Sequence, residues 1–216
     1  MRLNQAQVIE KVFKAYDCRD ALELGFFHGV STVYMASILK SMGDRRTLTT
    51  IDLLSAKERS PNLDELAAKF GVSDHVEAFY EPRSYLWRLK AFIEEGRKFD
   101  FCYLDGGHTW ADSGFAFFLI DKLLKKDGVI LFDDMKWTPE HQPAAQHWPE
   151  DERTTAAVER VWTLLVMQHP NYDRVWTHGN WALAQKRDNT PLVGGAKRIW
   201  RKLIGANKYI NFRPDR

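Results

Sequence analysis

Two predicted strands end in carboxylates, and these acids are the residues best placed to do chemistry. The segment FDFCYLD ends at Asp105, and GVILFDD ends at Asp133 and Asp134. In an open parallel sheet, ligands bind at the carboxyl ends of the strands, and adjacent strands lie about 4.8 Å apart. If these two strands are neighbours, the three carboxylates converge, repel one another and favour a hard divalent cation such as Mg²⁺. Separate solvated acids, or acids that cap helices, are the simpler alternative.

His108 follows Asp105 by three residues, across two glycines. A neutral imidazole beside a bound metal ion can accept the proton of a hydroxyl group that the metal has acidified. The alternative is that His108 caps the helix predicted to begin near Trp110, or is simply exposed. Its position beside Asp105 and the later pair of acids favours the role of general base.

A second group of candidate residues lies in the segment ELGFFHGVS, which begins at Glu23. Gly25 ends a predicted strand and Gly29 begins a predicted helix, so the chain can turn sharply and a ligand can approach the backbone. Asp52 ends the next strand, where an acid accepts hydrogen bonds from ribose hydroxyls in nucleoside sites. The dinucleotide fingerprint G-x-G-x-x-G is absent, because Phe27 replaces its second glycine. Glu23 can instead pair with an ammonium group. A glycine turn of an α/β protein without a nucleoside is the simpler alternative.

Both groups of motifs resemble one known family. ALELGFFHGVSTVYMA followed by LTTIDL resembles the first two motifs of class I S-adenosylmethionine (SAM)-dependent methyltransferases. FDFCYLDGGHTW followed by LIDKLLKKDGVILFDDM resembles the acidic block of the metal-dependent O-methyltransferase branch. Within that branch the sequence is similar to catechol O-methyltransferases and to sugar and macrolide O-methyltransferases. The similarity covers roughly residues 20–135.

The resemblance implies a cofactor site. It implies Glu23 near the ammonium group of SAM, Ser31 at its carboxylate and Asp52 at its ribose. It also places Gly25 and Gly29 against the cofactor. The family often carries G-D-S after the third strand, where it touches the adenine, whereas this chain reads E-P-R-S. The resemblance therefore leaves the adenine contacts unassigned.

The resemblance also implies a metal site, in which Asp105, Asp133 and Asp134 bind Mg²⁺ or another divalent cation. Catechol-type members carry a lysine base at the position of His108, whereas sugar methyltransferases of the macrolide type carry a histidine. We therefore expect a SAM- and metal-dependent O-methyltransferase that acts on a hydroxyl of a sugar or natural product, with His108 as general base. Two alternatives stay open: methylation of a catechol-like phenol, and a SAM-binding partner module without methyl transfer.

Apolar runs alternate with helical periodicity along the chain, which predicts a mostly parallel α/β sheet covered by helices on both faces. The resemblance implies a seven-stranded, Rossmann-like fold with an antiparallel last strand. The predicted helices span 4–17, 30–41, 62–71, 84–95, 110–126 and 152–168. The predicted strands span 21–26, 48–53, 75–80, 99–104 and 128–132, followed by a hairpin of 172–176 and 181–185.

A long loop is predicted over 136–151, a position typical of a lid over the site. It contains Trp137, His141, His147 and Trp148. Aromatic faces of this kind suit a sugar or an aromatic ring, and they equally suit packing within the loop itself.

The chain of 216 residues carries 31 basic and 29 acidic side chains and two cysteines. This balance gives no nucleic-acid signature, and two cysteines exclude a disulfide scaffold. Without a signal-peptide core or a long apolar run, we expect a cytoplasmic protein. We expect a methyltransferase domain over 1–188 and a basic extension over 189–216.

The extension carries an apolar stripe flanked by basic residues. The stripe consists of Ile199, Trp200, Leu203 and Ile204. Such a segment suits docking on its own domain or on a second subunit of a homo-oligomer. It also suits peripheral contact with an anionic membrane surface.

Overall fold

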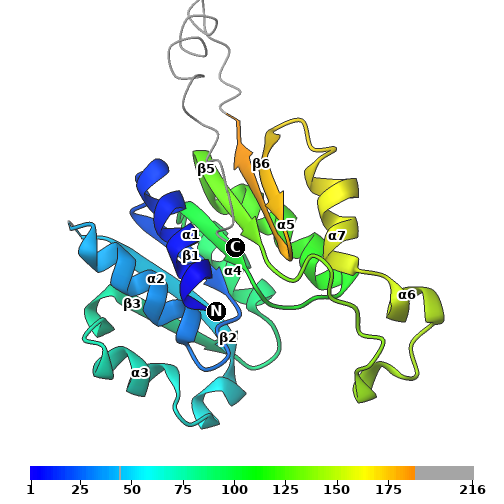
Figure 1. Ribbon diagram of the computed structural model, residues 1–216, viewed down its shortest axis with the longest axis horizontal. Helices are drawn as coiled ribbons and strands as arrows, with labels where there is room; N and C mark the ends of the chain where they lie inside the picture. The colour runs from blue at the N-terminus through cyan, green and yellow to red at the C-terminus, as the bar shows by residue number, and fades with distance from the viewer. Residues whose placement is uncertain (44, 188–216) are drawn as a thin grey trace, which may run out of the picture.

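The computed structural model describes residues 1–43 and 45–187, which form one sheet with helices on both faces (Figure 1). The strand order of the seven-stranded sheet is β3-β2-β1-β4-β5-β7-β6. The first five strands pair in parallel, and β7 runs antiparallel to both β5 and β6. The predicted seven-stranded, mostly parallel sheet with an antiparallel last strand is thus confirmed. The predicted extension 189–216 and its apolar stripe lie outside the described residues.

The elements follow the predicted order. The strands are β1 (Asp20–Leu24), β2 (Thr47–Leu53), β3 (Val76–Glu81), β4 (Phe99–Leu104), β5 (Leu124–Phe132), β6 (Tyr172–His178) and β7 (Trp181–Lys186). The helices are α1 (Leu3–Ala15), α2 (Val30–Ser41), α3 (Leu63–Lys69), α4 (Tyr85–Glu94), α5 (Trp110–Leu123), α6 (Glu150–Thr154) and α7 (Ala157–Val161). Within the described residues, none of the helices has the length and apolar character that a membrane span requires.

The central strands are buried on both faces, which explains their nearly continuous apolar runs. In β1, Leu22 and Leu24 enter the core beneath α4, α5 and α7, whereas Ala21 enters the core beneath α1, α2 and α3. The same alternation in β4 sends Cys102 to the first core and Tyr103 to the second. Side chains that alternate between two apolar layers fix the register of the strands.

Two predicted helices differ from the structure by more than two residues at an end. The helix predicted over 110–126 ends at Leu123, because Leu124 already pairs with Phe99 in the sheet. The single helix predicted over 152–168 is divided into α6, α7 and a π-helical turn, Trp162–Val166. Between α6 and α7, Thr155 is extended. The division has a physical reason: α6 buries none of its residues, whereas α7 begins where apolar side chains become available to pack on the sheet.

The strand order brings the predicted site together. β1 lies between β2 and β4, and β4 pairs with β5. The chain reverses its direction of winding at β1 and β4, and ligands of open α/β sheets bind in the crevice at such a switch point. At the carboxyl edge, the Asp133 N–H donates to the Leu104 carbonyl at 3.0 Å, so Asp105 and Asp133 leave adjacent strands at the same level.

Candidate functional site

The glycine turn after β1 is held tightly against the turn after β4. Gly25 has φ +87°, and a Cβ atom at this position would lie 2.5 Å from the Asp105 carbonyl oxygen. Gly29, with φ +92°, is the N-cap of α2, and a Cβ atom there would lie 2.6 Å from Leu63 Cδ1. Both glycines are therefore required by backbone conformation and by close approach. Phe27 also has positive φ, +55°, and its ring is exposed at the turn.

Asp52 closes this turn from the end of β2. Its Oδ2 atom accepts the backbone N–H groups of Phe26 at 2.9 Å and Phe27 at 2.7 Å. Its Oδ1 atom accepts the N–H of Leu53 at 2.6 Å. Asp52 is therefore a structural anchor of the glycine turn, a role that the sequence motif did not predict, as well as the acid predicted to face a ribose.

Glu23 is fully buried beneath the turn. Its Oε2 atom accepts hydrogen bonds from the hydroxyls of Thr32 at 2.5 Å and Thr50 at 2.7 Å. Burial raises the pKa of Glu23 to about 7, against the opposing effect of the neighbouring hydroxyls of Ser31, Thr32 and Thr50. The Oε1 atom has no hydrogen-bond partner among the described residues. A buried carboxylate with an unpaired oxygen is a suitable partner for an ammonium group, which is the role predicted for it.

Asp105, Asp133 and Asp134 gather at the carboxyl edge of β4 and β5, as the sequence predicted. Burial, together with the charges of Asp133, Asp134 and Glu23, raises the pKa of Asp105 to about 9. Burial and the charge of Asp133 also raise the pKa of Asp134, whereas His108 lowers it. The acids are therefore close enough to repel one another electrostatically.

Both carboxylate oxygens of Asp133 already have partners within the protein. The Tyr103 hydroxyl donates to Asp133 Oδ2, and the Asp134 N–H donates to Asp133 Oδ1 at 2.7 Å. Across the described ranges, no three His, Cys, Asp or Glu side chains are grouped as a metal centre requires. The donor chemistry fits a hard cation, because all three side chains offer oxygen. Their present arrangement, however, brings them to one edge without assembling a ligand set.

His108 stands beside Asp134 and does not cap α5. Its Nε2 atom lies 3.2 Å from Asp134 Oδ2, and its ring centroid lies 4.9 Å from that of Trp137. The N-cap of α5 is Thr109, whose side chain accepts the Asp112 N–H at 3.1 Å. Of the two alternatives weighed from the sequence, the capping role is therefore wrong for His108. A carboxylate on one ring nitrogen fixes the tautomer and orientation of the imidazole.

His108 also lines a pocket of about 540 Å³ between the start of α5 and the segment that contains α6 and α7. Its aromatic lining comes from Trp110 and from Trp148 of the predicted lid loop. Its polar lining includes Asp151, Glu152, Thr155 and Arg160. The loop therefore contributes to the pocket through Trp148 and to the histidine through Trp137. His141 and His147 are exposed and do not line the pocket.

The segment after β3 departs from the family pattern, and the structure shows what its polar groups contact. Glu81 is buried, and its Oε1 atom accepts from Arg88 Nε at 2.6 Å. Ser84 is the N-cap of α4 and accepts the Leu86 N–H at 3.2 Å. Both side chains thus have internal partners, and no residue of this segment is assigned to an adenine.

The comparison with a family model decides the identity of the fold: residues 22–135 match a model described as a methyltransferase domain. The chain belongs to the methyltransferase-domain family. The match includes the glycine turn, Asp52, His108 and the acidic edge, whereas the pocket residues from Trp148 to Arg160 lie beyond it. No curated protein sequence matches the chain.

Solved structures resemble this methyltransferase over most of its length. An O-methyltransferase from Bacillus cereus in complex with S-adenosylhomocysteine (SAH) has a TM-score of 0.68 and 18% identity, covering 87% of this chain and 82% of the other. The O-methyltransferase TomG from Streptomyces achromogenes, involved in tomaymycin synthesis and solved with SAM, has a TM-score of 0.66 and 20% identity, covering 87% and 82%. The SAH-bound Podospora anserina methyltransferase PaMTH1 has a TM-score of 0.63 and 17% identity, covering 87% and 80%. At these identities the likeness shows the fold.

Proposed function

We propose that the protein transfers the methyl group of SAM to a hydroxyl group of a sugar or natural product, with a divalent cation and with His108 as general base. The observation that carries the proposal is the His108–Asp134 pair at the wall of the 540 Å³ pocket, on the same sheet edge as Glu23 and Asp52. SAM and SAH in the similar O-methyltransferases support the choice of cofactor.

The residues at the cofactor end have the chemistry that SAM requires. The Oε1 atom of Glu23, which has no hydrogen-bond partner among the described residues, suits the ammonium group, and the N-terminus of α2, beyond Gly29, offers N–H groups to the carboxylate. The Oδ2 atom of Asp52 already accepts two N–H groups of the turn, whereas its Oδ1 atom accepts only the Leu53 N–H and retains acceptor capacity for a ribose hydroxyl.

At the acceptor end, His108 is the residue that moves the proton. With Nε2–H donating to Asp134, the Nδ1 atom is the acceptor for the hydroxyl proton, and Asp134 stabilises the imidazolium that forms. SAM supplies an electrophilic methyl group when bound, and a cation held by Asp105, Asp133 and Asp134 would supply a Lewis acid that acidifies the hydroxyl. The raised pKa of Asp105 supports a cation there, because a positive charge relieves the repulsion among the acids.

The lining of the acceptor pocket supports a sugar-like substrate. Trp110 and Trp148 provide flat apolar faces, and Asp151, Glu152 and Arg160 provide charged hydrogen-bonding groups. A volume of about 540 Å³ lies within the range of small-molecule sites.

The test is methyl transfer from SAM to a panel of sugar, macrolide and catechol acceptors, measured as SAH release. We expect His108→Ala to lower turnover by about 10²–10⁴-fold, the usual effect of removing a general base, with SAH affinity unchanged. The matched control is His147→Ala, because His147 is exposed and does not line the pocket. Wild-type turnover in His108→Ala would remove this histidine from the mechanism, and failure of the wild-type protein to bind SAH would reject the cofactor.

A further inference from the structure

The segment between β2 and α3 packs on the glycine turn, a contact that no motif of the sequence predicted. Arg59 lies in this segment, and its guanidinium carbon is 3.9 Å from the centroid of the Phe27 ring. Two residues further along, the Pro61 carbonyl oxygen lies 2.7 Å from His28 Nδ1. The segment therefore contacts two consecutive residues of the turn that the cofactor is expected to approach.

The ring of Phe27 is the partner that the structure gives to Arg59. The Arg59 guanidinium forms no hydrogen bond or ion pair with the part of the chain that the structure describes, and its Nη1 atom is buried. The face of an aromatic ring carries partial negative charge and attracts a guanidinium that lies over it. The position of this cation and the position of the Phe27 ring are therefore linked.

Phe27 needs such a contact because its backbone conformation is unusual. Its φ of +55° lies in the left-handed region, which residues other than glycine keep only where their surroundings enforce it. The ring is 63% exposed, and the contacts that hold it include the Arg59 guanidinium and the His28 ring, whose centroid lies 4.5 Å away. Loss of the cation would remove one of the contacts that keep this conformation.

The backbone of Phe27 in turn holds Asp52. The Phe27 N–H donates to Asp52 Oδ2 at 2.7 Å, which fixes one oxygen of the carboxylate. The orientation of the other oxygen, Oδ1, follows, and this is the oxygen that retains acceptor capacity for a ribose hydroxyl. We propose that Arg59 is a positioning residue for SAM, which acts through the Phe27 ring on the orientation of Asp52. The inference rests on the cofactor site proposed above.

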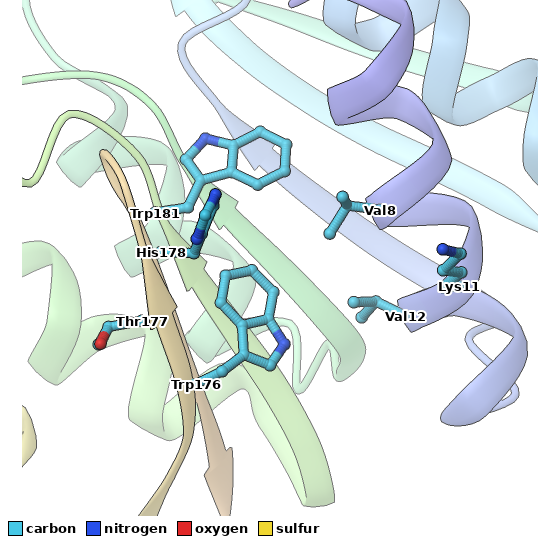
Figure 2. Close-up of a pocket in the computed structure, with 7 residues that line it drawn as sticks. All are labelled: Val8, Lys11, Val12, Trp176, Thr177, His178 and Trp181. Atoms are coloured by element: carbon cyan, nitrogen blue, oxygen red, sulfur yellow. The ribbon is translucent and has the colours of Figure 1, made fainter. Parts of the chain in front are cut away.

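The acid at the end of β5 is supported from a different part of the fold. Asp133 accepts the Tyr103 hydroxyl, and the Tyr103 ring packs edge-to-face on Trp181 with 6.1 Å between centroids. Trp181 lines a cavity of about 270 Å³ between α1 and the β6–β7 hairpin (Figure 2). None of the residues that line this cavity belongs to the glycine turn or to the segment between β2 and α3. A change at Arg59 should therefore affect Asp52 and leave the support of Asp133 intact.

The experiment measures the dissociation constant of SAH for the full-length protein by calorimetry. Arg59→Met removes the charge and should weaken SAH binding by about 2–30-fold, the range of a cation–π contact. Arg59→Lys keeps a cation over the ring and should retain most of the affinity. The matched control is Lys69→Met, because Lys69 ends α3 and lies 5.8 Å from the ring of Phe70, which is 58% exposed. This variant should bind SAH as the wild-type protein does.

A second ligand tests the link to the ribose. The probe 5′-methylthioadenosine contains the ribose and adenine of SAH and lacks its amino-acid part. Arg59→Met should weaken the binding of this probe by the same factor as the binding of SAH. Unchanged binding of the probe would overturn the proposal, because Arg59 would then act at the amino-acid end of the cofactor.

A double-mutant cycle tests whether Arg59 acts through the ring. Phe27→Leu removes the aromatic face and keeps the N–H, so Arg59→Met should cause no further loss of SAH affinity in the Phe27→Leu protein. An equal loss in both backgrounds would overturn the proposal, because Arg59 would then contact the cofactor directly. Wild-type affinity in Arg59→Met would also overturn it, as would a loss in Arg59→Lys as large as that in Arg59→Met. Failure of the wild-type protein to bind SAH would reject the cofactor and, with it, this role of Arg59.

Discussion

Replacing Gly25 by alanine tests whether the close approach of the glycine turn to β4 holds the site together. The residue has φ +87°, where a side chain costs about 1–2 kcal/mol. The new Cβ atom would also lie 2.5 Å from the Asp105 carbonyl oxygen and 3.0 Å from Gly106 Cα. Both neighbours are backbone atoms that cannot rotate away, so we add about 1–3 kcal/mol for overpacking. The expected loss in free energy of unfolding is therefore about 2–5 kcal/mol.

The matched control is Gly96→Ala, because Gly96 has a similar φ of +72° with nothing within 4 Å of the added Cβ atom. It should show only the conformational cost. Urea unfolding followed by circular dichroism measures both variants. The difference between them isolates the contact with Asp105 and Gly106, and Gly25→Ala should also weaken SAH binding. Equal destabilisation of the two variants would refute the close packing of the two turns.

Three further predictions concern charged groups of the site. Burial raises the pKa of Glu23 from 4.5 to about 7. The neutral carboxyl group therefore stabilises the folded protein at low pH, and this contribution is lost as pH rises from about 4.5 through about 7. Glu23→Gln should remove up to about 3 kcal/mol of that dependence in urea unfolding between pH 5 and 8, and parallel curves for both proteins would contradict it. Asp52→Ala removes the acceptor of the Phe26 and Phe27 N–H groups. It should lower the free energy of unfolding by about 2–4 kcal/mol and weaken SAH binding at least about tenfold. Unchanged SAH affinity would exclude Asp52 as a ligand of the cofactor. Asp134→Ala should abolish activation by Mg²⁺ in the methyl-transfer assay while SAH still binds, and an unchanged Mg²⁺ response would remove Asp134 from the ligand set.

The residues of the site were predictable where the signal was local. Gly25 and Asp52 stand at strand ends, and their types alone indicate a turn and an acceptor. The three acids were predicted to meet only if β4 and β5 are neighbours, a condition that the strand order satisfies. The hydroxyl partners of Glu23 were not predictable, because Thr50 faces it through the register of β1 and β2 and Thr32 comes from α2.

Other features needed the packed structure. Tyr103 occupies an apolar strand and reads as a core residue, yet its hydroxyl reaches Asp133 at the sheet edge. The capping alternative for His108 was open in the sequence, because either His108 or Thr109 can precede a helix that begins at Trp110. The helix predicted over 152–168 followed from periodicity alone, which does not reveal that its first residues have no surface on which to pack.

If the 540 Å³ pocket binds the methyl acceptor as proposed, the break between α6 and α7 identifies the part of its wall that opens for substrate entry and product release. Glu152 of α6 and Trp148 of the preceding loop line the acceptor pocket, yet α6 buries none of its residues. The wall they form can therefore separate locally, at a free energy well below that of global unfolding, while α7 stays packed on the sheet. Turnover limited by product release would then be insensitive to the stability of the core. Core substitutions that raise the melting temperature should leave turnover unchanged. Shortening or rigidifying the segment before Thr155 should change it.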